Sequence, residues 1–496
     1  MNPTVMRRSV ALRACHAACF LTLATIFAAC DLIDARPTTP AAADSEDAAD
    51  AAHTGPHARQ PNLVLIILDT VRRDRVQPCG YDKPTTPNLV LLGTQSTTFC
   101  RTVTPGSWTA PVHASMLTGL LPSEHGLDYL PVKPTRSEKW ADIAKMNPDV
   151  ETLPEILSEH GYQTALVSAN PVVNPTLGLA RGFDFVNVNP GGWTEGRALV
   201  SPSMGAVLDR LDPDRPLFLT LNIWIAHNPY ESVPEEAGWT PPTPLIDLFA
   251  APNKDKSSSI FARYLRSDYD PAEEATLLAN IASGYDWGVH LADRDLGRAL
   301  DLLTERGLLA ADTTIVVTSD HGELLGEHRM LDHGGVLYRS NIDVFTMVRG
   351  PGFAPGRRID SLVQSQDIFP TFLQNAGIEV PPTAHAVPLQ QPDPNRQAVT
   401  MTMRNSWLAN FVAPGEFEQR HMVALQEGDK RVLWLDGGLE GQVVPGLEMV
   451  EKTASADPEL SRRIHDFAEQ WQSATRTTTE ISDEMRAGLE ALGYLQ

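Results

Sequence analysis

Basic residues are scarce in this chain, with 40 lysines and arginines against 62 acidic residues and a formal net charge of −22. A surface of this charge repels nucleic acid and other anionic polymers unless a local patch offsets it. We therefore expect no nucleic-acid partner. The 496 residues suffice for one large domain or two, and the 42% hydrophobic content is typical of a globular protein with a sizeable core.

Cysteine is also sparse, with five residues in the chain, and their spacing fits no cysteine-based zinc site. Cys15 and Cys19 lie in an N-terminal leader, and Cys30 lies directly after it. Cys79 and Cys100 remain. A disulfide between these two and a pair of separate buried thiols are both compatible with the sequence. The chain has no internal repeat.

The N-terminal apolar run, Ala17 to Ala29, is too short and too rich in small residues to make a good membrane span. Three arginines precede it, as in a secretory signal, so residues 1–29 are expected to be a signal peptide. The run ends in Phe-Ala-Ala-Cys and resembles a bacterial lipobox, which implies cleavage before Cys30 and lipid attachment to its sulfur. An ordinary signal peptide cut nearby is the alternative.

Residues 30–60 are rich in alanine, proline, threonine and aspartate and show no apolar period. This composition indicates a flexible tether. We therefore expect an exported protein of the bacterial cell envelope, anchored to a membrane through lipid on Cys30. Which membrane carries it, and its oligomeric state, do not follow from the sequence.

Strand and helix patterns alternate from Pro61 onward, which predicts an α/β fold with a mostly parallel sheet between helices. We expect strands at 62–68, 98–103, 163–168, 216–223, 313–318 and 344–349, and helices at 86–95, 151–160, 271–306 and 367–376. Residues 61–380 would form this main domain.

A smaller C-terminal α+β subdomain is expected at 381–496, because short alternating runs there indicate an antiparallel hairpin. A helix at Ser482–Leu492 would close the chain. The segment Glu231–Asp270, rich in proline, serine and charge, interrupts the main domain and is expected to form part of a substrate rim.

Two apolar runs that each end in acid indicate a metal site. NLVLIILD closes on Asp69, and TTIVVTSDH closes on Asp320 and His321. Both runs are typical of buried parallel strands, and chemistry in open α/β sheets lies beyond the carboxyl ends of such strands. Two carboxylates and one imidazole suit a divalent cation such as Ca²⁺, Mn²⁺ or Mg²⁺. The alternative is that each aspartate only caps a following helix.

The stretch from Ser107 to Gly119, SWTAPVHASMLTG, is expected to begin a helix at or just after Thr109. Pro111 suits the first helical turn, and a helix N-terminus favours an anion. A hydroxyl, a cation and a helix N-terminus together describe a site for a sulfate or phosphate ester. The alternative is that Thr109 is only the N-cap of the helix.

These stretches, with GYDKPTTPNL, HNPY, TSDHGELLGEH and LEALGYL in the same order, resemble a sulfatase-type member of the alkaline phosphatase superfamily. The resemblance implies one divalent metal held by Asp69, Asp320 and His321, with Thr109 as a further ligand. Family members often carry a second aspartate after the first, where this chain has Thr70.

The resemblance also implies that Thr109 is the nucleophile. Sulfatases place there a cysteine or serine that is oxidised to formylglycine, in a Cys-x-Pro-x-Arg type of motif. This chain has Thr109 and His113 at the two defining positions. A formylglycine hydrate expels sulfate by collapsing to an aldehyde, whereas a sulfated threonine has no second hydroxyl for this step. Thr109 therefore favours phosphoryl transfer.

Four histidines complete the expected site. His113 lies one helical turn after Thr109 and would bind the ester anion or orient Thr109. By resemblance, His227 and His333 contact the ester and one of them protonates the leaving oxygen. His328 is a further substrate-binding candidate. Glu323 and Glu327 are expected to orient a histidine or the metal, and His125 to be structural.

The sequence thus predicts a metal-dependent hydrolase of sulfate or phosphate esters, carried by small-molecule, glycan or lipid substrates. One alternative is a phosphodiesterase, a phosphonate hydrolase or a phosphoethanolamine-type transferase that uses the same threonine. Another is a non-catalytic lipoprotein in which this fold only binds.

Overall fold

A computed structural model of the chain describes residues 60–128, 143–188, 200–228, 230, 264, 269–382, 385–403, 421–428, 430–435, 458–473 and 477–479. The expected signal peptide, the expected tether, most of the 231–270 insertion and the expected closing helix at 482–492 lie outside the described residues. The described residues all belong to one compact unit. No helix in the described ranges combines the length and the apolar character needed to cross a membrane.

Among the described residues, nine strands form the main sheet, in the order β11-β2-β10-β7-β1-β6-β4-β5 with β12 beside β2. Strands β7, β1, β6, β4 and β5 run parallel, whereas β10 runs antiparallel to β7 and β2. Their bounds are β1 (Leu63–Leu68), β2 (Thr97–Val103), β4 (Gln163–Ser168), β5 (Phe185–Val188), β6 (Leu217–Ile223), β7 (Thr314–Thr318), β10 (Asp343–Arg349), β11 (Arg357–Ile359) and β12 (Val363–Gln364).

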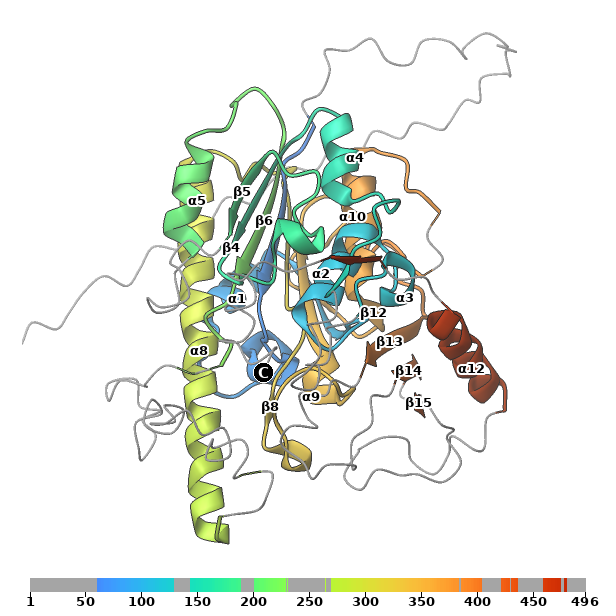
Figure 1. The fold of residues 1–496 in the computed structure, drawn as a ribbon. Coiled ribbons are helices and arrows are strands. Elements are labelled where there is room, and N and C mark those ends of the chain that lie inside the picture. The colour runs from blue at the N-terminus through green and yellow to red at the C-terminus, as the bar shows by residue number, and fades with distance from the viewer. Residues whose placement is uncertain are drawn as a thin grey trace, which may run out of the picture. The chain divides into compact units, whose positions relative to one another are not determined.

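Two helical layers bury the sheet, as Figure 1 shows. Strand β1 is buried along its whole length because its alternate side chains enter different layers. Val64, Ile66 and Leu68 pack in one core with α1 (Pro87–Gly93), α5 (Val200–Leu208) and α8 (Pro271–Glu305). The other alternate set, Leu63, Leu65 and Ile67, packs with α2 (Thr109–Thr118), α4 (Leu153–Glu159) and α10 (Ile368–Ala376).

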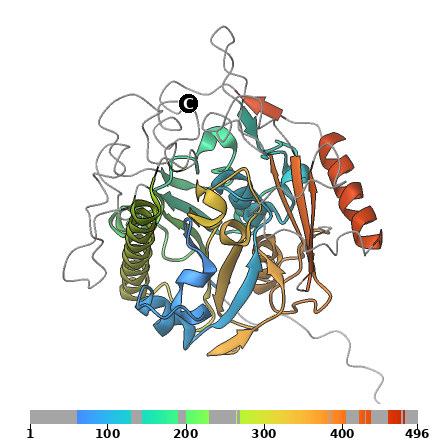
Figure 2. The same cartoon turned by 90° about the horizontal axis from the view of Figure 1, so that it is seen from below.

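Helix α8 anchors the segment that contains the GYDKPTTPNL motif. It begins at a capping box made by Asp270 and Glu273 and is 35 residues long. The helix lies on one side of the sheet and its N-terminal part extends beyond the strands (Figure 1 and Figure 2). The buried carboxylate of Asp286 accepts hydrogen bonds from the Tyr81 hydroxyl and the Lys83 ammonium, both at 2.7 Å. Asp293 accepts two backbone N–H bonds at the start of α1. The motif therefore has a structural role in this chain.

Cys79 and Cys100 form a disulfide, which settles the alternative that the sequence left open. The bond joins the turn η2 (Gln77–Cys79), which follows β1, to strand β2. It therefore fixes the segment that leaves the central strand.

The C-terminal part forms a three-stranded antiparallel sheet of β13 (Gln397–Met403), β14 (His421–Glu427) and β15 (Lys430–Leu435). Helix α12 (Pro458–Ser473) packs on this sheet. Strand β13 holds the segment before α2, because the Met401 amide bonds the Pro105 carbonyl at 2.8 Å and the Thr400 hydroxyl bonds the Thr104 carbonyl at 2.8 Å.

The expected α/β fold, with a mostly parallel sheet between helices, is confirmed. Each of the ten strands and helices expected in the main domain is present, with ends within two residues of the expected ones. The expected hairpin is confirmed as β14 and β15. The antiparallel β10 makes the sheet mixed. Several described elements were not predicted from the sequence. Among them are two short strand pairs, β3 (Ile143–Lys145) with β16 (Thr477–Thr479) and β8 (Leu324–Leu325) with β9 (Leu331–Asp332).

Candidate active site

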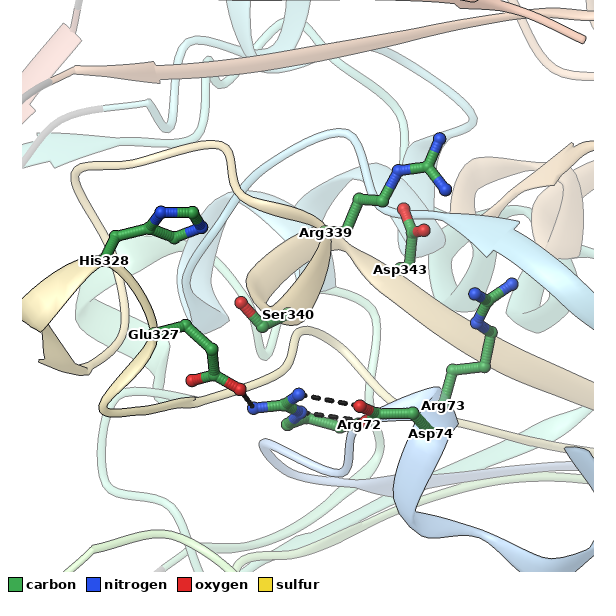
Figure 3. Close-up of a pocket in the computed structure, with 8 residues that line it drawn as sticks. All are labelled: Arg72, Arg73, Asp74, Glu327, His328, Arg339, Ser340 and Asp343. Carbon is green, nitrogen blue, oxygen red and sulfur yellow. Dashed lines mark hydrogen bonds and ion pairs between the residues drawn. The ribbon is translucent and has the colours of Figure 1, made fainter. Parts of the chain in front are cut away.

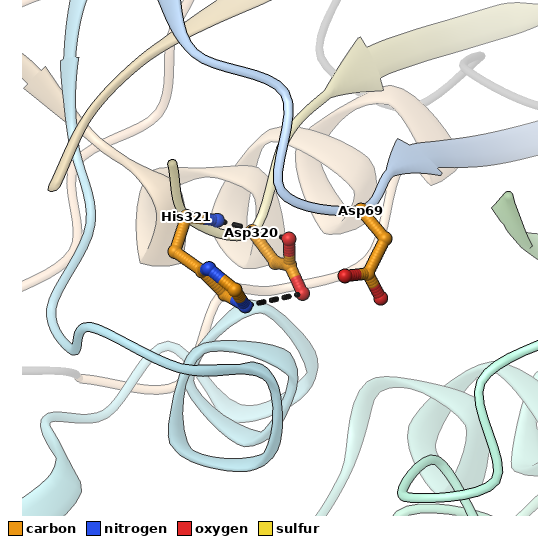
Figure 4. A group of neighbouring side chains, drawn as sticks. All are labelled: Asp69, Asp320 and His321. Atoms are coloured by element: carbon orange, nitrogen blue, oxygen red, sulfur yellow. Dashed lines mark hydrogen bonds and ion pairs between the residues drawn. The ribbon is translucent and has the colours of Figure 1, made fainter. Parts of the chain in front are cut away.

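The register of the two central strands brings Asp69 and Asp320 together. Strands β1 and β7 are parallel neighbours in which Ile67 pairs with Thr318, and each aspartate lies two residues further along its own chain. Asp69, Asp320 and His321 offer ligand atoms that all lie within 4.8 Å of one another, and all three residues are fully buried (Figure 4). The sequence correctly predicted this group.

The bonding of the two carboxylates fits a cation. Asp69 Oδ1 and Asp320 Oδ2 are buried and accept no hydrogen bond, although the other oxygen of each carboxylate does. A buried carboxylate oxygen without a donor is costly unless a positive charge faces it. Two such oxygens and the Nε2 atom of His321 form a donor set that suits Ca²⁺, Mn²⁺ or Mg²⁺. The residues present therefore fit a divalent metal.

The two carboxylates also repel each other, because both are negatively charged when ionised. Burial raises the pKa of Asp69 well above its usual range, and the nearby Asp320 charge raises it further. Burial alone would raise the pKa of Asp320 too. His321 and His113 outweigh that effect, so the pKa of Asp320 lies below its usual range. Two buried carboxylates at this separation are stabilised together by a shared cation.

Thr70 contributes its backbone to the site. Its amide donates to Asp320 Oδ1 at 3.1 Å, and its carbonyl accepts the Tyr285 hydroxyl at 2.6 Å. The φ of Thr70 is +60°, in the left-handed region that β-branched residues rarely adopt. Such strain persists where surrounding contacts hold it. At the position where sulfatases often carry a second aspartate, this chain has Thr70, whose amide orients Asp320. Asp74 pairs instead with Arg72 at 2.7 Å.

Thr109 is the first residue of α2 and lies beside the metal group. Trp108 is the N-cap and its side chain makes no cap bond, so the N-cap alternative for Thr109 is wrong. The buried Thr109 Oγ1 is 3.3 Å from His321 Nε2 and 3.3 Å from Asn170 Nδ2. The first-turn N–H groups of α2 give this position a partial positive charge that favours an anion.

His113 lies one helical turn further along α2, on the same side as Thr109, as the sequence predicted. Its Nε2 atom is 3.5 Å from Asp320 Oδ2 and 3.4 Å from Asn222 Nδ2. The side chain is buried. His113 therefore reaches the metal group directly, where it can contact an ester bound at Thr109.

His227 and His333 join the same group through their rings. The two rings meet edge to face with centroids 4.8 Å apart, and the His333 ring is 4.3 Å from that of His321. His333 Nδ1 contacts Glu323 Oε1 at 3.2 Å and Asp332 Oδ1 at 2.9 Å. Burial raises the pKa of Glu323 to about 7, although His333 opposes the shift. Glu323 thus orients His333, in line with its expected supporting role.

His328 lies elsewhere. Its ring stacks on Tyr338, with centroids 3.9 Å apart, and it lines a pocket to which Asp69, Asp320 and His321 do not contribute (Figure 3). Glu327 binds Arg72 at 2.6 Å on the same side. His125 is buried and contacts the Ser115 hydroxyl at 3.0 Å, which agrees with a structural role.

Two asparagines of the site were missed by sequence reasoning. Asn170 follows β4 and Asn222 lies near the end of β6, and both donate to Asp69 Oδ2, at 2.8 and 3.1 Å. Their orientation is fixed, because Asn170 Oδ1 accepts the Val172 amide and Asn222 Oδ1 accepts the Ser168 hydroxyl. The sequence pattern that could have identified them is a polar residue at the carboxyl end of a buried strand, which is also the pattern that identified Asp69.

A protein-family model described as Sulfatase matches residues 61–378. A sulfatase of Formosa agariphila is 23% identical over 76% of this chain and 80% of its own length. A choline-sulfatase of Rhizobium meliloti is 24% identical over 65% of this chain and 68% of its own length. The chain spans about 61% of arylsulfatase K of Rattus norvegicus, to which it is 24% identical.

Solved structures share the fold. One, in complex with its substrate D-glucosamine-2-N,6-O-disulfate, matches with a TM-score of 0.57 and 18% identity, over 84% of this chain and 98% of that one. A phosphonate monoester hydrolase of Silicibacter pomeroyi matches with a TM-score of 0.55 and 18% identity, over 83% of this chain and 94% of that one.

Proposed function

Because this chain belongs to the sulfatase family, we propose that it is a metal-dependent hydrolase of sulfate or phosphate esters, with Thr109 as the nucleophile. One observation carries the proposal. The Thr109 hydroxyl lies at the start of α2, 3.3 Å from His321, a member of the buried group that fits a cation. A nucleophile, a metal group and a helix N-terminus thus meet at one point.

Asp69, Asp320 and His321 would hold the metal, with Thr109 Oγ1 as a further ligand. A bound divalent cation there would lower the pKa of the Thr109 hydroxyl and offset the negative charge of the ester. His113 and the first-turn amides of α2 would contact the ester oxygens, because His113 is on the same side of the helix as Thr109.

The proposed reaction has two displacements. Thr109 loses its proton to solvent, and its oxygen bonds the sulfur or phosphorus while the bond to the leaving oxygen breaks. His227 or His333 gives the leaving oxygen its proton, so an alcohol departs. Water then attacks the same sulfur or phosphorus. One of its protons restores the Thr109 hydroxyl, inorganic sulfate or phosphate departs, and the histidine regains its proton from solvent. The net reaction is hydrolysis of the ester.

Threonine at this position favours phosphorus over sulfur. A sulfated threonine cannot collapse to an aldehyde and must be cleared by direct water attack, whereas in-line attack at phosphorus needs no second hydroxyl. A phosphodiesterase, phosphonate hydrolase or phosphoethanolamine-type transferase is therefore the second candidate function. The fold match to a phosphonate monoester hydrolase is compatible with it. A non-catalytic binding role is the alternative that retains the fold without turnover.

We propose that the substrate is a small-molecule, glycan or lipid ester. Among proteins of similar fold, one was solved with a disulfated glucosamine as its substrate and another with neocarrahexaose. We also propose an exported enzyme of the bacterial cell envelope that is anchored through lipid on Cys30. The Cys79–Cys100 disulfide supports this location, because disulfides persist in oxidising compartments.

The test is hydrolysis of three matched aryl esters, a sulfate, a phosphate monoester and a phosphodiester, with Ca²⁺, Mn²⁺ or Mg²⁺ supplied separately. We expect turnover of at least one ester that requires a divalent metal and is lost in Asp320→Asn. Turnover of the phosphorus esters alone would select the second candidate function. No turnover of any ester, together with no bound metal, would leave only the non-catalytic role.

A further inference from the structure

A pocket lies at the same edge of the sheet as the metal group. It encloses about 260 Å³ and is lined by Arg72, Arg73, Asp74, Glu327, His328, Arg339, Ser340 and Asp343 (Figure 3). Its residues come from the segment after β1, the segment after β7, the short helix α9 (Arg339–Ile342) and the first residue of the antiparallel β10. These segments meet at the carboxyl ends of β1 and β7. The volume approaches the lower end of small-molecule sites, which hold about 300–1,000 Å³.

Two arginines hold the three acidic residues of this pocket. Arg72 binds both oxygens of Asp74, at 2.9 and 2.7 Å, and Glu327 at 2.6 Å. Asp343 binds Arg431 at 2.7 Å, and Arg431 does not line the pocket. One guanidinium therefore faces two carboxylates at the Arg72 end of the pocket, whereas Asp343, at the other end, has an arginine of its own.

Two further arginines line the pocket, Arg73 and Arg339. Arg73 donates to the carbonyl of Cys100 at 3.1 Å, and Arg339 is exposed. Within the described ranges, neither one pairs with a carboxylate. Figure 3 shows both side chains reaching toward the end of the pocket where the Asp343 carboxylate lies. Arg73, Arg339 and Arg431 thus surround one carboxylate, which leaves an excess of positive charge at that end.

Hydrogen bonds connect the segment that lines the pocket to the segment that carries His321. The Gly322 amide, next to His321, bonds the Asn341 carbonyl at 2.7 Å, and the Glu323 amide bonds the Ser340 carbonyl at 3.1 Å. Arg72 is two residues after Thr70, whose amide orients Asp320. An anion in the pocket would therefore contact the segments that carry the metal ligands.

We propose that the Arg73 and Arg339 end of this pocket binds an oxyanion, either sulfate or carboxylate. The chain as a whole is acidic, with a net charge of −22, so a local basic patch favours the approach of an anionic molecule. Guanidinium groups are the donors that carboxylate and sulfate oxygens prefer, and two of them lie at this end of the pocket. The oxyanion is a second charged group of the substrate or a free anion. If the oxyanion is a group of the substrate, the inference rests on the proposed function; if it is a free anion, the inference does not.

Direct binding tests the site without turnover. Inorganic sulfate is titrated calorimetrically at low ionic strength, with excess chelator so that the metal group does not hold it. We expect the wild-type protein and Arg210→Gln, a control at an exposed arginine that contacts Phe185, to bind sulfate equally. Arg339→Gln should weaken binding at least tenfold, and Arg339→Lys should restore part of it. No sulfate binding by wild type, or equal binding by Arg339→Gln, would overturn the proposal.

Steady-state kinetics distinguish an oxyanion that belongs to the substrate from a free anion. D-Glucosamine-2-N,6-O-disulfate is compared with a monosulfated aryl ester, each with wild type, Arg339→Gln and Arg210→Gln. A KM that rises more for the disulfate than for the monoester in Arg339→Gln assigns the site to the substrate. A response of both hydrolysis rates to added sulfate, present in wild type and lost in Arg339→Gln, assigns it to a free anion. Sulfate binding with neither effect would overturn any role in catalysis. A loss of ester turnover in wild type would contradict the proposed function but leave the titration interpretable.

Discussion

Asn170 Nδ2 lies 3.3 Å from Thr109 Oγ1 and, at the same time, 2.8 Å from Asp69 Oδ2. One amide therefore connects the proposed nucleophile to a proposed metal ligand. Because both hydrogens of that amide are directed by fixed partners, Asn170 holds the two oxygens at a set separation. We infer that Asn170 is a positioning residue of the active site.

Asn222 provides a matched comparison for this role. Asn222 also donates to Asp69 Oδ2, at 3.1 Å, but its other contact is His113. We expect Asn170→Ala and Asn222→Ala to weaken metal binding by a similar factor, roughly 10–100-fold as for other residues that support ligands. At saturating metal, Asn170→Ala should show the larger fall in kcat, with KM little changed. Equal kcat values for the two variants, measured with the ester that wild type hydrolyses best, would show that the Thr109 contact has no function.

The backbone at Gly322, next to the metal ligand candidate His321, packs closely against a neighbouring segment. A Cβ atom added there would lie 1.9 Å from the Ser340 carbonyl oxygen and 3.0 Å from Arg72 Cγ. Overpacking of this kind costs roughly 1–3 kcal/mol. We expect Gly322→Ala to lose bound metal, measured by elemental analysis of the purified protein, and to unfold more readily in urea.

Gly205 supplies the control for that substitution. It lies in α5, and a Cβ atom there would meet only Leu302 Cδ2 at 3.7 Å. Alanine also favours a helix interior over glycine by about 1 kcal/mol. Gly205→Ala should therefore be as stable as wild type or more stable, with full metal content. A Gly322→Ala protein that keeps its metal would contradict the packing described for this segment.

The pH dependence of stability should carry a contribution from His125. Burial lowers the pKa of this imidazole to about 3, from an ordinary value near 6.5. The folded state therefore holds His125 neutral, whereas the unfolded chain binds its proton below about pH 6.5. The stability that His125 gives is fully present above that pH and is lost as the pH falls toward 3, by roughly 1.4 kcal/mol per pH unit.

Replacement of His125 isolates this contribution. Nδ1 of the ring accepts the Leu127 amide at 3.1 Å, and Nε2 contacts the Ser115 hydroxyl. A glutamine can make similar contacts but does not titrate. In urea unfolding between pH 7 and pH 5, His125→Gln should start less stable than wild type and lose less stability on acidification. Parallel pH profiles for the two proteins would exclude a neutral buried His125.

Sequence reasoning identified the metal group because its three members share one strong signal, an acid or histidine directly after a buried strand. Asp69 and Asp320 emerge from adjacent strands in matching register, which topology rules anticipate once both strands are parallel. Asn170 and Asn222 gave only a weak signal, because an asparagine after a strand usually serves a turn.

The histidine-rich segment after β7 shows where such reasoning fails. His328 and His333 are five residues apart, and no periodicity assigns a side to either one. The β8 and β9 ribbon and the left-handed backbone of His328 and Asp332 decide the outcome, since they place His333 against His321 and His328 against Tyr338. Such local geometry depends on tertiary contacts that a single sequence does not reveal. The pocket around Arg339 was unforeseen for the same reason.

The proposed membrane anchor rests on Cys30 and can be tested separately. Cys19 lies within the expected signal peptide and provides the control. In a bacterial host, Cys30→Ala should lose labelled fatty acid and leave the membrane fraction, whereas Cys19→Ala should retain both. Fatty-acid labelling of Cys30→Ala would show that Cys30 is not the lipidated residue.

The measurement that bears most directly on the account is mass spectrometry of the enzyme during turnover of an ester that it hydrolyses. The reaction is quenched rapidly in acid, digested and searched for a covalent intermediate. We predict that the peptide containing Thr109 gains the mass of one sulfuryl or phosphoryl group, and that Thr109→Ala forms no adduct and no product. An active Thr109→Ala enzyme, or an adduct on another residue, would contradict Thr109 as the nucleophile.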